Sequence, residues 1–144
     1  METGKMRFRK AKVNFVKVNL NPSKLKTSDC VVRAIAKTEE KHWLEIYWDL
    51  CTLGASMFEM PNGKNVWKKY LTQNSYTKTP VKEVYKLVNS KRKRKVVNDV
   101  CKLDGEHIVQ VANHIVAVKD KQYYDTIDSG GYCVYTIWTK GVQQ

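Results

Sequence analysis

The sequence predicts an α+β protein in which N-terminal helices pack on a C-terminal antiparallel sheet of about four strands. Three observations lead to this fold class. Before Gly105 apolar residues recur mainly every three or four positions, which is the helical period, and after it they alternate, which is the strand period. The length of 144 residues, 42% of them hydrophobic, suits one domain over 1–144 with a sizeable core.

The chain begins with a basic segment and a short strand. Residues 1–12 are rich in Lys and Arg and contain little that could pack, so we expect a frayed lead-in. Alternation over 12–18 predicts a strand. The segment 19–26, which contains Pro22, predicts a loop that leads to the first helix.

Helices are predicted from the end of this loop onward. Ser28 and Asp29 are residue types that cap helices, and the apolar run after them predicts a helix over 29–38. Apolar residues at helical spacing predict a second helix that ends at Gly54. Further along we expect an irregular connection with a short helix at 66–71, and another helix opened by Thr79-Pro80.

The four predicted strands all follow Gly105. They are expected at 107–112, 114–119, 123–127 and 132–138. Turns are expected at 120–122 and 129–131, where polar and glycine residues interrupt the alternation.

The charge balance favours anionic partners. The sequence has 26 Lys or Arg and 14 Asp or Glu, a formal charge of +12. The basic run Lys91, Arg92, Lys93, Arg94 and Lys95 predicts either a solvated turn or a contact with an acidic protein or nucleic acid. No interleaved aromatics, RNP-type motif or helix-turn-helix pattern accompanies the run, so its basic character is the only sign of nucleic-acid binding.

The cysteines and the apolar pattern indicate a reduced, cytoplasmic protein. The four cysteines show no C-x-x-C spacing, so neither a zinc cluster nor a disulfide framework is predicted, and we expect no metal or cofactor. No apolar stretch resembles a signal peptide or reaches 18 residues, so we expect no membrane contact.

Cys30 is the candidate nucleophile. The predicted cap at Ser28 and Asp29 puts it in the first turn of a helix, where the free backbone N–H groups and the helix dipole favour a thiolate. The alternative is that Cys30 is a small buried apolar residue, as most free cysteines are.

A thiolate nucleophile requires a base and a group that orients the base. His114 opens the second predicted strand and is the candidate base, with His107 as a less favoured alternative. A three-residue turn at 120–122 would bring His114 opposite Asp128, at the end of the next strand. A two-residue turn would reverse the faces and favour Asp125 instead. We expect Asp128 and keep Asp125 as the alternate.

The sequence around these residues resembles the papain-like cysteine peptidases. The likeness lies in Ser-Asp-Cys-Val-Val-Arg-Ala-Ile-Ala at 28–36, Ala-Asn-His-Ile-Val-Ala-Val at 112–118 and Tyr-Asp-Thr-Ile-Asp-Ser at 124–129. It is similar to small phage-encoded papain-like proteins related to the bacteriocin-leader peptidases. The resemblance implies a papain-like fold and a hydrolase, a peptidase or isopeptidase, that acts on a phage or host protein or peptide in the host cytoplasm. It implies that Cys30 is the nucleophile, His114 the base and acid, and Asp128 the orienting residue.

One departure concerns the oxyanion hole. Papain-like enzymes usually have a Gln about six residues before the Cys, and here Lys24 holds that position. The backbone N–H of Cys30 can supply one donor, and Asn19 or Asn21 is expected to supply another. The Lys24 departure also favours the alternative function, a catalytically inactive papain-like protein that inhibits a partner through its basic surface.

Overall fold

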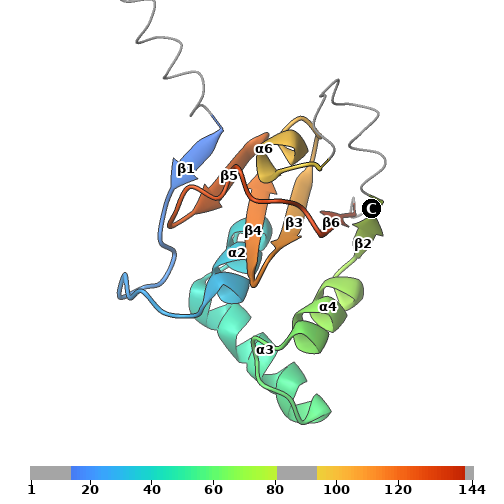
Figure 1. Ribbon diagram of the computed structural model, residues 1–144. Coiled ribbons are helices and arrows are strands. Elements are labelled where there is room, and N and C mark those ends of the chain that lie inside the picture. The colour runs from blue at the N-terminus through green and yellow to red at the C-terminus, as the bar shows by residue number, and fades with distance from the viewer. Residues whose placement is uncertain (1–13, 81–93, 142–144) are drawn as a thin grey trace, which may run out of the picture.

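The computed structural model describes residues 14–80 and 94–141, and these form a six-stranded mixed sheet flanked by helices (Figure 1). The strand order is β1-β5-β4-β3-β6-β2. All neighbouring pairs are antiparallel except β1 and β5, which run parallel. The strands are β1 (Phe15–Lys17), β2 (Tyr76–Thr79), β3 (Glu106–Val111), β4 (His114–Lys119), β5 (Gln122–Asp125) and β6 (Thr136–Lys140).

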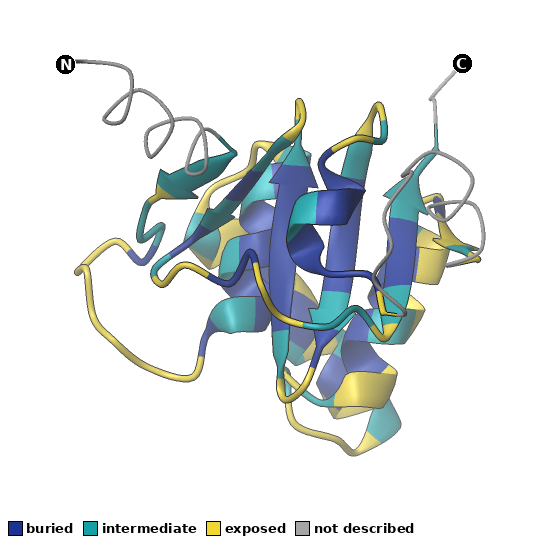
Figure 2. Cartoon of the chain, turned by 45° about the horizontal axis from the view of Figure 1, so that its top comes forward, coloured by how far each residue is buried: buried dark blue, intermediate teal, exposed yellow. Residues whose placement is uncertain are grey.

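The helices divide the core between the two faces of the sheet. They are α2 (Cys30–Glu39), α3 (Trp43–Met57), α4 (Lys64–Gln73) and α6 (Val97–Val100). The first three pack with alternate side chains of the sheet, such as Ile108, Ile115 and Trp138, in one apolar cluster. The short α6 packs with side chains of the other parity, such as Val109 and Val116, in a second cluster. Figure 2 shows the central strands buried between these layers and the loop before α2 exposed.

The α+β class is confirmed, but the prediction of about four antiparallel strands is wrong. Two edge strands come from the first half of the chain: β1, whose strand character was predicted, and β2, which was not. Only four residues make β2, and its exposed positions Thr77 and Lys78 give no apolar alternation to detect. Thr79 therefore ends a strand instead of capping a helix, and the predicted continuation beyond Pro80 lies outside the described residues.

The helix α3 also runs past its predicted end at Gly54. That glycine is buried, and a Cβ atom there would lie 2.7 Å from the carbonyl oxygen of Glu59. Glycine here therefore lets the backbone just after the helix approach its last turn closely. The helix ends at Phe58, which adopts the left-handed conformation with φ of 57°.

The turn between β4 and β5 has two residues instead of the predicted three. Asp120 and Lys121 both have positive φ, 53° and 63°, as two-residue hairpin turns require. Lys119 therefore pairs with Gln122, one position away from the predicted partner Tyr123. A slip of one residue exchanges the faces of the whole strand, so this turn decides which acid can approach His114.

Only part of the predicted basic patch can be placed. Residues 91–93 lie outside the described residues, Arg94 is exposed, and Lys95 is buried with only 3% of its surface exposed. Lys95 therefore does not belong to a solvent-facing patch. Within the described residues, no helix combines the length and the apolar character needed to cross a membrane.

Candidate active site

Cys30 is the first residue of α2 and faces the start of β4. Asp29 is the N-cap residue, and its side chain makes no capping hydrogen bond, so the first-turn N–H groups of the helix are not occupied by it. The sulfur of Cys30 hydrogen-bonds with the side chain of His114 and with the backbone N–H of Ile115. The structure thus brings together the two residues that the sequence placed 84 positions apart.

The surroundings of Cys30 favour its thiolate. Burial alone would raise its pKa, but the hydrogen bonds from His114 and Ile115 oppose burial, as do the positive charges of His114 and Arg33. Their sum lowers the pKa of Cys30 below the ordinary value of a thiol. A thiol of lowered pKa beside a histidine is the arrangement that cysteine nucleophiles require.

Asp125 orients the imidazole of His114 and favours its protonated form. The Nε2 atom of His114 lies 2.6 Å from Oδ2 of Asp125, and the carboxylate is only 2% exposed. The hydrogen bond to Asp125, followed by the one to Cys30, raises the pKa of His114 to about 9, although burial opposes this. At neutral pH His114 is therefore an imidazolium, and its positive charge favours the thiolate form of Cys30.

The carboxylate of Asp125 is held by three further donors. The hydroxyl of Ser129 donates to Oδ2 at 2.8 Å, and the backbone N–H of Thr126 donates to Oδ1 at 2.7 Å. Arg33, from α2, donates to Oδ1 at 3.3 Å. Burial would raise the pKa of Asp125, but the bonds from His114, Ser129 and Thr126 outweigh it and lower the pKa. Asp125 is thus an ionised carboxylate fixed from several sides.

Arg33 connects this carboxylate to a second one, Asp29. Its Nε atom donates to Asp29 Oδ1 at 2.8 Å, so one guanidinium bridges the N-cap of the nucleophile helix and the end of β5. Asp29 is 5% exposed and also accepts from Asn21 Nδ2 and Trp43 Nε1, at 3.2 and 3.0 Å. Arg33 was not among the site residues predicted from the sequence. Its spacing of four residues from Asp29 on a predicted helix was a detectable signal.

The predicted pairing of His114 with Asp128 is wrong, and the alternate Asp125 takes that place. Asp128 accepts hydrogen bonds from the Tyr123 hydroxyl and from the backbone N–H of Gly130, the latter at 3.1 Å. The cause is the two-residue turn, which puts Asp125 and not Asp128 on the face that His114 requires. Asp128 stabilises the loop after β5 instead.

The predicted side-chain donors to the oxyanion hole are used elsewhere. Asn19 Nδ2 donates to the carbonyl oxygen of Leu25 at 3.2 Å, and Asn21 Nδ2 is bound to Asp29. Lys24 donates from Nζ to the carbonyl oxygen of Asn19 at 2.9 Å. All three therefore stabilise the loop before α2. Of the predicted donors, the backbone N–H of Cys30 remains.

A cleft of about 440 Å³ opens beside the sulfur. Cys30 and His114 line it together, with Trp67 and Tyr135 as aromatic walls. Polar side chains that line the same cleft, and that can donate to an oxyanion or a substrate, are Ser28, Asn62, Lys64, Gln110 and Asn113. A peptide carbonyl in this cleft would approach both the sulfur and the first turn of α2.

Cys101 and His107 are both buried. Burial raises the pKa of Cys101 to about 12, and burial lowers the pKa of His107. The ring of His107 bonds to Thr139 and to the carbonyl oxygen of Asp104, so it is not near the nucleophile. The backbone of Cys133 forms an isolated antiparallel β-bridge with that of Val96. Within the described ranges, no group of three or more Cys, His, Asp or Glu is arranged to hold a metal.

Comparison with known proteins adds no relative to this description. No protein-family model matches the chain, and neither a curated protein nor a solved structure matches it.

Asp125→Asn is expected to lower the pKa of His114 from about 9, because the bond to Asp125 is the largest cause of its elevation. An NMR titration of the His114 ring protons measures this directly. Asp128→Asn is the matched control and should leave the titration near pH 9, since Asp128 does not touch the ring. A downward shift in the Asp128 variant, with none in the Asp125 variant, would contradict the assignment.

Proposed function

We propose that this protein is a papain-like cysteine hydrolase, a peptidase or isopeptidase, in which Cys30, His114 and Asp125 act as nucleophile, base and orienting acid. The observation that carries the proposal is the continuous chain of hydrogen bonds from the sulfur through the imidazole to a buried carboxylate. A nucleophile at a helix N-terminus and a base on an adjacent strand support the papain-like fold as part of this proposal. The resemblance adds that it is phage-encoded and acts on a host or phage protein in the host cytoplasm.

The geometry supports acyl transfer in two steps. The Cys30 thiolate attacks the substrate carbonyl carbon, a C–S bond forms, and the oxyanion is stabilised by the Cys30 N–H. The imidazolium of His114 gives its proton to the leaving amine as the C–N bond breaks, which leaves a thioester. His114 then removes a proton from water, the hydroxide attacks the thioester, and the acid product leaves with the thiolate and imidazolium restored.

A catalytically inactive binding protein is the second candidate. The observation in its favour is that the side chains of Asn19, Asn21 and Lys24 are all engaged in other hydrogen bonds, so none of these three replaces the usual glutamine donor. Such a protein would use its basic surface to occlude an acidic protein or nucleic acid.

Labelling with iodoacetamide at pH 6 separates the two candidates. Because the pKa of Cys30 is lowered, we expect Cys30 to be alkylated at least tenfold faster than a free cysteine, with Cys51, Cys101 and Cys133 unlabelled. Peptide mass spectrometry identifies the labelled site, and reaction of Cys30 with the epoxide inhibitor E-64 tests the peptidase-like cleft. Alkylation no faster than that of free cysteine would refute the hydrolase and favour the binding protein.

A further inference from the structure

A second groove adjoins the active site. It has a volume of about 950 Å³, and Ser28, which also lines the cleft of Cys30, is part of its wall. Asp29 and Arg33, the ion pair at the start of α2, line it as well. Ser28 therefore belongs to both, and the groove lies next to the cleft of the candidate nucleophile.

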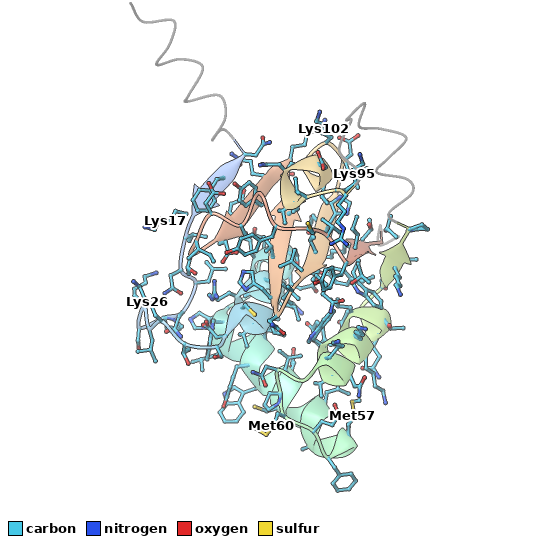
Figure 3. The ribbon with its side chains drawn as sticks, viewed as in Figure 1. Lys17, Lys26, Met57, Met60, Lys95 and Lys102 are labelled. Atoms are coloured by element: carbon cyan, nitrogen blue, oxygen red, sulfur yellow. The ribbon has the colours of Figure 1, made fainter. Side chains whose placement is uncertain are left out.

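The groove carries positive charge that no acidic residue in the described ranges 14–80 and 94–141 neutralises. Lys17, at the end of β1, and Lys26, in the loop before α2, are both exposed lining residues. Neither makes an ion pair with any residue that the structure describes. The acid in the wall, Asp29, already has the guanidinium of Arg33 and two further donors. Figure 3 shows Lys17 and Lys26 on the same side of the molecule, away from Lys102.

Three aliphatic residues also line the groove, among its polar and charged ones. Leu25 and Ile127 line the groove with 59% and 50% of their surfaces exposed, and Val18 lies with them. A ligand that covered these exposed leucine and isoleucine side chains would gain binding free energy, because their apolar surface would be removed from water. None of the described residues that line this groove is aromatic, so among them there is no stacking surface of the kind that single-stranded nucleic acids use.

From this combination we propose that the groove selects the substrate, and that it binds a protein segment in which acidic and aliphatic residues alternate next to the scissile bond. Lys17 and Lys26 pair with the acidic side chains, and Leu25 and Ile127 cover the aliphatic ones. That the bound segment is a substrate rests on the proposed hydrolase function. The binding itself requires no chemistry, so it is tested in a protein that cannot react.

The test uses the full chain with Cys30→Ala and fluorescence polarisation. The probes are fluorescein-labelled hexapeptides of alternating Glu and Leu, of alternating Gln and Leu, and an oligothymidylate. We expect the Glu–Leu peptide to bind at least tenfold more tightly than the Gln–Leu peptide. Lys17→Glu with Lys26→Glu should weaken it about tenfold, and Leu25→Ser with Ile127→Ser should weaken it severalfold.

The matched control reverses the charge of two lysines that lie outside the groove. Lys78→Glu with Lys102→Glu makes the same change in net charge at exposed positions that do not line the groove, and should alter the affinity less than twofold. Three results would overturn the inference: no binding or equal binding of the two peptides, equal weakening by the control pair, or tighter oligothymidylate binding that is lost on reversal of Lys17 and Lys26. Iodoacetamide labelling of Cys30 in the native protein is independent of all three, so a failed groove and a failed hydrolase are distinguishable.

Discussion

His114→Ala is expected to reduce the hydrolysis of p-nitrophenyl acetate by about 100-fold at pH 7, the lower end of what a general base contributes. Two causes act in the same direction. The hydrogen bond from His114 is the largest contribution that lowers the pKa of Cys30, so without it burial raises that pKa and the thiolate is depleted. The acyl-enzyme also loses the base that activates water.

The matched control for this variant is His42→Ala. His42 is exposed and caps α3, where its Nδ1 atom accepts from the backbone N–H of Leu44 at 3.1 Å. Its removal should leave the ester hydrolysis within about twofold of the native rate, since it does not touch Cys30. If His114→Ala retained the native rate while Cys30→Ala lost it, the thiol would be acting without this base, and the proposed mechanism would be wrong.

Arg33→Met is expected to lower the free energy of unfolding by about 3 kcal/mol, the lower end of the cost of breaking a buried ion pair, because Asp29 loses its cation whereas Asp125 keeps His114. Arg33 is the cation between Asp29 and Asp125, whose side chains are 6% and 2% exposed. Methionine retains much of the apolar stem, so the change removes mainly the charge and its hydrogen bonds. Urea denaturation followed by far-ultraviolet circular dichroism measures the difference.

Lys41→Met is the matched control. Lys41 pairs with Glu45 at the same spacing of four residues, at 3.5 Å, but the two side chains are 40% and 53% exposed. An exposed pair of this kind contributes at most about 1 kcal/mol. Equal losses in the two variants would mean that burial does not strengthen the dependence on Arg33.

The positions of Cys30 and His114 were predictable because each depends on a local pattern. A capping pair before an apolar run places Cys30 at a helix start, and alternation after a turn places His114 at a strand start. No local pattern of this kind predicts which acid hydrogen-bonds to His114. The choice between Asp125 and Asp128 depends on whether the turn holds two or three residues, and Asp-Lys-Gln at 120–122 gives no glycine to decide it.

Pairing between residues far apart in the sequence accounts for the other differences between the predicted fold and the structure. Strand β1 lies beside β5, and β2 beside β6, over separations of more than 50 residues that no local pattern reports. The bridge from Arg33 to Asp125 spans 92 positions in the same way. Sequence patterns give each element, whereas tertiary packing selects its neighbours.

Asp125 has two roles, and they differ in what they imply for descendants of this protein. It accepts from His114, but it also neutralises Arg33 and receives the Ser129 hydroxyl and the Thr126 N–H. A homologue without the proposed activity would still need this acid to pair with Arg33 and join the helix to the sheet, whereas it would no longer need the thiol and the imidazole. Retention of the acid alone therefore says nothing about activity, and the Cys–His pair is the feature to inspect in any homologue.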